Sequence, residues 1–255
     1  MKKRVFSVRY ALQLRKLLIR IPDLSENYPI VIASFNNPTF LTSMVDQVLA
    51  KKLGPIIILD SNSTYPPMLS LLLQYEKQGI GILRFRINVG PRYIFESGLW
   101  RVLPRIFVFT DPDLRLSKEF SKEHLKVFVE LSQTFKIGKV GCTLSLKDSK
   151  KFNQDIYYLG KSITDWESQF WKDKLTFDDS TVGYRAIIDT TFSLYNKRFL
   201  SREKFFKAIR IDQVRGTDVS AHHFPWYLDS VVPKPERDAY MELTKTSGFT
   251  SWGIG

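Results

Sequence analysis

The chain contains a single cysteine, Cys142, among its 255 residues. One cysteine excludes an internal disulfide framework and is typical of proteins in a reducing compartment. Because no histidine lies near it in the sequence, we interpret Cys142 as a small buried residue rather than as a nucleophile. Long apolar runs are also missing, since no stretch approaches the roughly 20 residues needed to span a bilayer.

Two glycine-based phosphate-binding motifs are absent as well. No G-x-G-x-x-G follows the first expected strand, which argues against a dinucleotide-dependent dehydrogenase. No G-x-x-x-x-G-K-[ST] occurs either, so a P-loop phosphotransferase has no support. A phosphate-bearing ligand would therefore have to be held mainly by a metal ion and by side chains.

Acidic residues are scarce relative to basic ones. The sequence has 38 Lys and Arg against 26 Asp and Glu, which gives a formal net charge of +12. Such an excess predicts an anionic partner, and nucleotide phosphates, acidic lipid and nucleic acid all qualify. Composition alone does not choose among them.

Residues 1–27 form a basic amphipathic segment. Read as a helix, it places one apolar stripe on one side and basic residues on another, and Pro22 ends it. The stripe consists of Phe6, Tyr10, Leu14, Leu17 and Ile21, and the basic set includes Lys2, Arg9, Lys16 and Arg20. Internal charges argue against a cleaved signal peptide, so we expect the segment to remain.

Two interpretations of this segment stay open. The helix could lie on an anionic membrane with its apolar stripe at the lipid boundary, or it could pack on its own domain. The density of basic residues favours the membrane. We therefore expect a cytoplasmic protein with peripheral contact to the inner face of the cell membrane through residues 1–21.

From Tyr28 onward, buried strands alternate with helices. The pattern predicts an α/β fold with a parallel arrangement and right-handed crossovers. The expected strands are 29–34, 55–60, 82–87 and 106–110, and the expected helices are 39–52, 68–78 and 93–103.

Polar segments follow each of the four expected strands, namely 34–37, 60–62, 88–90 and 111–113. Ligands in open α/β sheets bind beyond the carboxyl ends of the strands. An Asp or Asn at one strand end is ordinarily a turn former or a helix cap. Four such ends in succession favour a ligand-binding crevice.

Asp111 and Asp113 directly follow the fourth expected strand. A spacing of two along a strand puts both side chains on one face. Two carboxylates there can share a divalent cation and, through it, a diphosphate. Such acidic triplets also arise by chance, so the context of this one gives it weight.

The motifs in order resemble those of the GT-A fold nucleotide-sugar glycosyltransferases, most like the bacterial family 2 enzymes. The resemblance covers roughly residues 28–232 and rests on segments 29–36 (PIVIASFN), 58–63 (ILDSNS), 88–90 (NVG), 108–113 (VFTDPD), 186–192 (AIIDTTF) and 221–227 (AHHFPWY). It implies a single Rossmann-like mixed-sheet domain flanked by helices. It also implies a UDP-sugar donor and a glycan or glycolipid acceptor, such as a bacterial surface polysaccharide.

The resemblance further implies roles for individual residues. The nucleotide-sugar donor would be bound by Ser34, Asn36, Asp60, Asn62, Asn88, Gly90, Arg92 and Asp111. Mn²⁺ or Mg²⁺ would be held by Asp111, Asp113 and His223, and would neutralise the departing nucleoside diphosphate.

Three carboxylates are candidates for the general base that inverting transfer requires. Asp189 is preferred and Asp218 is second, with Glu167 also considered; each could instead be a cap or an ion-pair partner. Trp166 and Trp226 are expected to contact acceptor sugars, because aromatic faces stack on their C–H faces. The competing interpretation places these aromatic side chains in the core.

The expected organisation has a donor half at 28–146, an acceptor-binding and catalytic half at 147–235, and an extended tail at 236–255. Two other classes of function remain as alternatives. A metal-dependent nucleotidyltransferase would consume a nucleoside triphosphate and release pyrophosphate. A basic nucleic-acid-binding protein would bind nucleic acid in a salt-sensitive manner, whereas the transferase hypothesis expects no nucleic acid.

Overall fold

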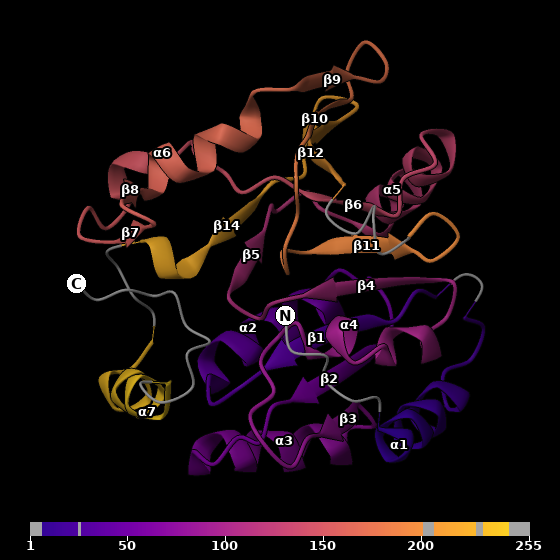
Figure 1. Ribbon diagram of the computed structural model, residues 1–255, viewed down its shortest axis with the longest axis vertical. Coiled ribbons are helices and arrows are strands. Elements are labelled where there is room, and N and C mark those ends of the chain that lie inside the picture. The colour runs from indigo at the N-terminus through magenta and orange to yellow at the C-terminus, as the bar shows by residue number, and fades with distance from the viewer. Residues whose placement is uncertain (1–6, 25–26, 201–206, 228–231, 245–255) are drawn as a thin grey trace.

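The computed structural model describes residues 7–24, 27–200, 207–227 and 232–244 (Figure 1). The described α-helices are α1 (Val8–Ile19), α2 (Pro38–Ala50), α3 (Pro66–Lys77), α4 (Tyr93–Glu96), α5 (Lys122–Thr134), α6 (Ile163–Ser168) and α7 (Lys234–Thr244). The described 3-10 helices are η1 (Leu99–Val102), η2 (Ser149–Lys151), η3 (Gln169–Trp171) and η4 (Phe224–Trp226).

Strands account for most of the remaining regular structure. They are β1 (Ile30–Ser34), β2 (Ile56–Asp60), β3 (Gly81–Arg84), β4 (Ile106–Thr110), β5 (Leu114–Leu116), β6 (Lys139–Cys142), β7 (Tyr157–Tyr158), β8 (Lys161–Ser162), β9 (Lys174–Thr176), β10 (Val182–Arg185), β11 (Ser193–Asn196), β12 (Ile209–Val214), β13 (Thr217–Asp218) and β14 (Ala221–His223).

One ten-stranded sheet forms the centre of the molecule, in the order β3-β2-β1-β4-β11-β6-β12-β10-β9, with β13 paired to β12. The first four strands in this order are parallel. Antiparallel pairing begins at β11, which lies between β4 and β6, while β12 runs parallel to β6. The predicted α/β domain with a mixed sheet is therefore confirmed.

Side chains alternate between the two faces of a strand, so a strand of buried apolar residues makes both faces of the sheet apolar. Helices cover both of these faces. In β1, Ile32 joins a core that contains residues of α2, α3 and α5. Its neighbour Val31 joins a second core with residues of α1, α4 and η1. The carboxyl ends of β1, β2 and β4 consequently meet at one edge, between two layers of helices.

Residue 147 is the expected boundary between a donor half and an acceptor half. Segments on both sides of this boundary contribute strands to the same sheet and residues to the same core. Ile32 of β1 belongs to the same apolar cluster as Val140 of β6 and Ile211 of β12. A shared core means that the two segments fold as one unit. Their division by ligand stays a functional prediction.

Two expected elements differ from the structure. The helix predicted at 93–103 is two short pieces, α4 and η1, because Gly98 between them adopts a left-handed φ of +83°. The tail predicted to be extended contains the helix α7, and its remaining residues, 245–255, lie outside the described part of the chain.

The amphipathic segment is helical from Val8, while Lys2 and Phe6 lie outside the described residues. Leu14 is fully buried in the core that α1 shares with β3, and Tyr10 and Leu17 pack against the same core. The stripe predicted to contact lipid thus packs on its own domain. Within the described residues, no helix combines the length and apolarity that crossing a membrane requires.

Candidate active site

Asn36 joins the first two strand-end loops. Its side chain is fully buried, and its Oδ1 accepts hydrogen bonds from the backbone N–H groups of Thr64 (2.8 Å) and Tyr65 (2.9 Å). Its own N–H donates to Ser63 Oγ at 2.9 Å. Its φ of +49° lies in the left-handed region, which Asn tolerates better than most residues. Asn36 therefore ties the end of β1 to the start of α3.

Asp60 ends β2 beside Ser34 of β1, which is its partner in the parallel ladder. The carboxylate is fully buried, and its Oδ2 accepts hydrogen bonds from Arg84 Nε (2.9 Å) and the Ser63 N–H (3.1 Å). Its Oδ1 is buried without a hydrogen-bond partner among the described residues. A buried oxygen of this kind is suited to accept a hydrogen bond from a ligand.

The other expected donor residues shape the loops around this edge. Asn62 has a φ of +65°, and Asn88 Oδ1 accepts a hydrogen bond from the Gly90 N–H at 3.1 Å. Gly90 has a φ of +74°, a conformation that a residue without a Cβ adopts readily. The Asn88–Gly90 turn thus depends on the Asn88 side chain as an acceptor and on a glycine at position 90.

Asp111 and Asp113 lie at the carboxyl end of β4. Thr190 Oγ1 donates a hydrogen bond to the Asp111 side chain, and the Asp111 N–H donates to the Thr190 carbonyl at 3.0 Å. Burial, followed by the charge of Asp113, raises the pKa of Asp111 well above its usual value. The two carboxylates are therefore close enough to repel each other.

Asp113 has one buried oxygen, Oδ1, that lacks a hydrogen-bond partner among the described residues. Its Oδ2 lies 3.4 Å from His223 Nε2. His222 instead contacts the Tyr227 hydroxyl at 2.6 Å. Of the two adjacent histidines, the one expected from the sequence, His223, is thus the one that faces the acidic pair.

Within the described ranges, no three His, Cys, Asp or Glu side chains come together to enclose a metal ion. Protein oxygens at Asp111 and Asp113 could therefore supply only part of a coordination shell. Mg²⁺ commonly binds through one or two carboxylates, with waters and substrate phosphates as its other ligands. The acidic pair fits that incomplete mode of binding.

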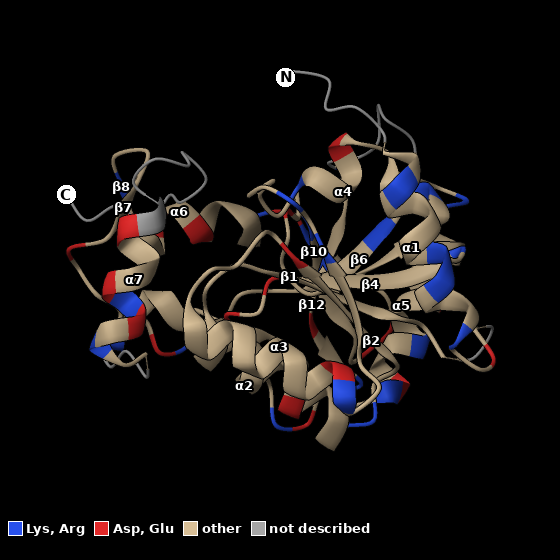
Figure 2. Cartoon of the chain, turned by 90° about the horizontal axis from the view of Figure 1, so that it is seen from below, with Lys and Arg blue, Asp and Glu red and all other residues tan. Residues whose placement is uncertain are grey.

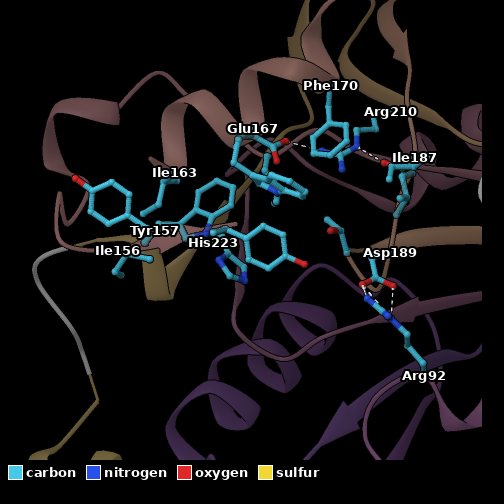
Figure 3. Close-up of a pocket in the computed structure, with 16 residues that line it drawn as sticks. Arg92, Ile156, Tyr157, Ile163, Glu167, Phe170, Ile187, Asp189, Arg210 and His223 are labelled. Atoms are coloured by element: carbon cyan, nitrogen blue, oxygen red, sulfur yellow. Dashed lines mark hydrogen bonds and ion pairs between the residues drawn. The ribbon is translucent and has the colours of Figure 1, made fainter. Parts of the chain in front are cut away.

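Arg92 and Asp189 form an ion pair at the wall of a cavity (Figure 3). Arg92 Nε donates to both carboxylate oxygens of Asp189, at 2.8 and 3.1 Å, and Nη2 also donates to Oδ2. This hydrogen bonding raises the pKa of Arg92 further. Asp189, the preferred base from the sequence, is thus engaged by a guanidinium.

A cavity of about 340 Å³ opens beside this pair. Its walls are largely apolar and aromatic, with charged groups at separate points (Figure 3). The lining residues that matter chemically are Arg92, Trp166, Glu167, Asp189, Arg210, His223 and Trp226. The cavity therefore brings Glu167 and Asp189 into one space and leaves out Asp218.

The two tryptophans occupy different positions in the cavity wall. Trp166 is half-buried and makes edge contacts with Tyr158 and Phe170. Trp226 is only 7% exposed, because it packs edge-on against Phe152 in the core. Both tryptophans line the cavity, so their contact with an acceptor sugar stays a prediction.

Glu167 and Arg210 form a buried ion pair at the cavity wall, with their side chains 2% and 5% exposed. Arg210 Nε also donates to the Ile187 carbonyl at 2.8 Å, and its guanidinium lies 4.2 Å from the Phe170 ring centroid. Burial raises the pKa of Glu167 to about 7, although Arg210 and His223 act to lower it. Arg210 was not identified from the sequence. The signal that could have revealed it is a basic residue between two isoleucines of a buried strand.

Lys139 is another buried cation that the motifs did not reveal. Its Nζ donates to the Ile188 carbonyl at 2.8 Å, directly before Asp189. Burial lowers the pKa of Lys139 to about 8. The lysine thereby anchors the segment that carries Asp189.

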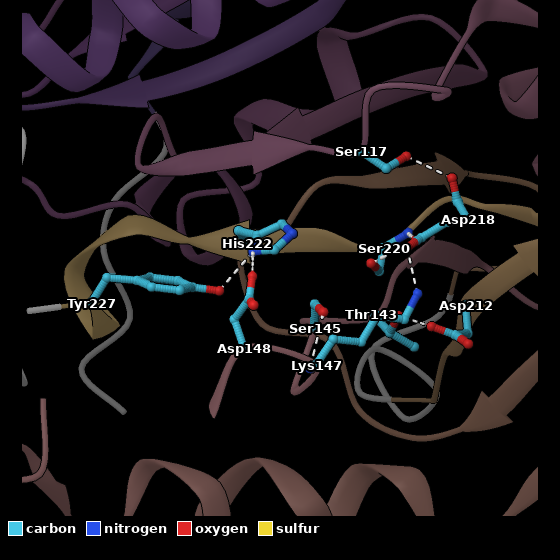
Figure 4. A network of polar contacts seen from close by, with 10 residues as sticks. All are labelled: Ser117, Thr143, Ser145, Lys147, Asp148, Asp212, Asp218, Ser220, His222 and Tyr227. Atoms are coloured by element: carbon cyan, nitrogen blue, oxygen red, sulfur yellow. Dashed lines mark hydrogen bonds and ion pairs between the residues drawn. The ribbon is translucent and has the colours of Figure 1, made fainter. Parts of the chain in front are cut away.

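Asp218, the second base candidate, belongs to a separate network (Figure 4). Its side chain accepts hydrogen bonds from Lys147 Nζ and from the N–H and Oγ of Ser220, at 2.8 and 2.7 Å for the serine. Burial acts to raise the pKa of Asp218, but these bonds outweigh it and lower the pKa. This position favours a structural role.

Helix α7 contacts the start of α2. Glu236 is buried, and its carboxylate accepts hydrogen bonds from the Thr39 N–H (3.1 Å) and Thr39 Oγ1 (2.6 Å). It thereby caps α2, whose N-cap residue Asn37 makes no side-chain cap. Burial, and then Asp113 and Asp111, raise the pKa of Tyr240, so this phenol lies near the acidic pair.

No protein-family model matches the chain, and no curated protein matches it. Among solved structures, it is similar to the mannosyltransferase PcManGT from Pyrobaculum calidifontis in complex with GDP-Man and Mn²⁺, with 13% identity, a TM-score of 0.41, and coverage of 74% of this chain and 51% of that one. It is also similar to S. aureus TarS 1–349 in complex with UDP-GlcNAc, with 11% identity, a TM-score of 0.41, and coverage of 67% and 45%. The chain thus spans about half the length of these proteins. Similarity of this size assigns no family.

We expect Asn36→Ala to lower the free energy of unfolding by about 2 kcal/mol, because the backbone N–H groups of Thr64 and Tyr65 both lose their acceptor. Asn36→Asp keeps an acceptor at the start of α3 and should lose less. Urea unfolding of both variants tests this, and equal losses would contradict the role assigned to Oδ1.

Lys139→Met tests the buried amine. In the wild type, the folded state binds fewer protons than the unfolded state between the lowered pKa of about 8 and the usual 10.5. The free energy of unfolding should therefore rise across that interval, by up to about 3 kcal/mol. Lys139→Met should remove this rise, while Lys161→Met, at an exposed site, should keep it. If the free energy of unfolding changes with pH in the same way in the wild type and in Lys139→Met across this interval, the lowered pKa assigned to Lys139 is wrong.

Proposed function

We propose that this protein is a metal-dependent glycosyltransferase that moves a sugar from a nucleotide-sugar donor to a glycan or glycolipid acceptor. One observation carries the proposal. The repelling carboxylates of Asp111 and Asp113 lie at the carboxyl end of β4 beside an aromatic cavity, and one buried oxygen of Asp113 has no hydrogen-bond partner in the described part of the chain. The resemblance over residues 28–232 supports the same assignment.

The nucleoside would bind over the ends of β1 and β2. Asp60 Oδ1 would accept a hydrogen bond from the base or the ribose, since it is buried and has no partner among the described residues. Asn88 and Gly90 would border the diphosphate, and Arg92 is near enough to the acidic pair to lower the pKa of Asp111. A UDP-sugar is the donor that we propose.

Mn²⁺ or Mg²⁺ would be held by Asp111 and Asp113, with His223 adjacent. When bound, the ion would offset the negative charge of the departing nucleoside diphosphate. The unpartnered Asp113 Oδ1 fits such an ion, because an anionic oxygen buried without hydrogen bonds is costly to fold.

We propose Glu167 as the general base, in place of the preference for Asp189. Both carboxylates line the cavity, and each is held by a guanidinium, Asp189 by Arg92 and Glu167 by Arg210. Burial raises the pKa of Glu167 to about 7, which is near the optimum for proton transfer at neutral pH. Its carboxylate would take the proton from the acceptor hydroxyl while that oxygen bonds to the anomeric carbon and the carbon–diphosphate bond breaks.

The acceptor would occupy the cavity between Trp166 and the Arg92–Asp189 pair. Tyr157, which lines the same cavity, is 57% exposed and offers an aromatic face for a sugar ring. A glycan or the sugar of a glycolipid fits this combination of aromatic surface and isolated charges. We propose that transfer occurs at the cytoplasmic side of a membrane.

The metal proposal predicts that Mn²⁺ with UDP raises the melting temperature of the wild type, since a ligand that binds only the folded state stabilises it. Asp111→Asn plus Asp113→Asn should abolish the response to Mn²⁺. Without metal, the double variant should melt no lower than the wild type, because the repulsion between the carboxylates is gone. Asp46→Asn, an exposed change on α2, is the matched control. An undiminished metal-dependent shift in the double variant would rule out this site.

The base proposal predicts that Glu167→Gln lowers kcat by about 10²–10⁴-fold. In the wild type, kcat should rise with pH through about 7 as Glu167 loses its proton. That rise should vanish in Glu167→Gln and persist in Asp189→Asn. Product analysis should show nucleoside diphosphate, whereas release of pyrophosphate from a triphosphate would indicate a nucleotidyltransferase.

A further inference from the structure

Helix α1 has a second apolar stripe that does not pack on the domain. Its members are Val8, Leu12 and Ile19, whose exposed fractions are 64%, 54% and 80%. Their spacing of four and seven residues places them on one side of the helix, away from the side that carries the buried Leu14 and Leu18. Large apolar side chains at such exposure are costly in water unless another surface covers them.

Basic residues flank this stripe. Arg9, Arg15, Lys16 and Arg20 are all exposed, and none of them is in an ion pair with a carboxylate in the described part of the chain. No acidic residue precedes Asp23 in the sequence. Figure 2 accordingly shows Lys and Arg, but no Asp or Glu, along α1.

The end of β3 lies beside the side of α1 that packs on the domain. The Arg86 N–H donates to Tyr10 Oη at 2.9 Å, which places the N-terminal part of α1 beside the carboxyl end of β3. Ile87, the next residue, is 67% exposed. The turn Asn88–Gly90 follows immediately, so this end of α1 lies at the same edge of the sheet as the candidate donor site (Figure 1).

We propose that this surface, the outer face of α1, binds an anionic lipid bilayer. Val8, Leu12 and Ile19 would enter the lipid boundary, while Arg9, Arg15, Lys16 and Arg20 would contact the headgroups. Amphipathic helices with basic residues beside apolar ones bind such interfaces by burying apolar area and by attraction to anionic headgroups. The stripe that the sequence suggested for this contact is the opposite one, which the domain itself covers.

Other occupants fit this surface less well. Nucleic acid would use the cations but would leave Ile19 and Leu12 in water, because phosphate contacts need no apolar partner. A second copy in a two-fold dimer would bring the same basic residues against each other without any acidic residue of α1 between them. Of these three occupants, an anionic bilayer is the one that covers the apolar side chains and also pairs with the basic ones.

The test is flotation of the full-length protein with vesicles of phosphatidylcholine alone or mixed with phosphatidylglycerol. We expect binding only to the mixed vesicles and a decrease at high salt. Arg15→Gln should lower the partition coefficient by about fivefold, the effect of one cation near an anionic surface. Leu12→Glu plus Ile19→Glu should abolish binding without changing the melting temperature, because both side chains are exposed.

Leu73→Glu is the matched control, since Leu73 is 59% exposed on α3, where Lys77 is the only basic residue. This control should float like the wild type. Equal binding by Leu12→Glu plus Ile19→Glu, or equal binding to neutral vesicles, would overturn the proposal. Binding to RNA that displaces the vesicles, or a dimer that the double variant dissociates in sedimentation, would assign the surface to those partners instead. Sugar transfer to a soluble acceptor plays no part in this readout, so the two proposals can fail separately.

Discussion

Two carboxylates held close together at the carboxyl end of β4 are the constraint around which the rest of the molecule is organised. Asp111 is fixed by Thr190, and its pKa is raised by burial and by Asp113, so the site opposes its own charge. A cation bound between the two carboxylates would relieve this repulsion. The structure places the cavity with Glu167, the Arg92–Asp189 pair and the helix α7 around that point, each supplied by a different part of the chain.

The strands and the strand-end loops could be predicted because they depend on local signals. Apolar runs such as 106–110 are bounded by polar residues, and parallel strands bring their carboxyl ends to one edge of a sheet. His223, which the resemblance favoured over His222, lies against Asp113, while its role as a metal ligand stays a prediction. In each case the residues that meet are neighbours in sequence or belong to adjacent strands.

The parts that escaped prediction depend on contacts between distant residues. Nothing in the sequence pairs Glu167 with Arg210, or Arg92 with Asp189, because each pair is separated by more than 40 residues and is joined only by the fold. The two stripes of α1 present a related problem. Both are apolar, and only the packing of Leu14 shows which one the domain covers. Gly98 likewise interrupts a helical pattern that otherwise continues.

The central claim is that the acidic pair binds a divalent cation together with the diphosphate of a nucleotide. Anomalous diffraction from a crystal grown with Mn²⁺ and UDP tests it most directly. The account predicts one manganese peak within bonding distance of Asp113 and of a diphosphate oxygen, with the uridine over the ends of β1 and β2. UDP bound at that edge without manganese beside Asp111 or Asp113 would contradict it.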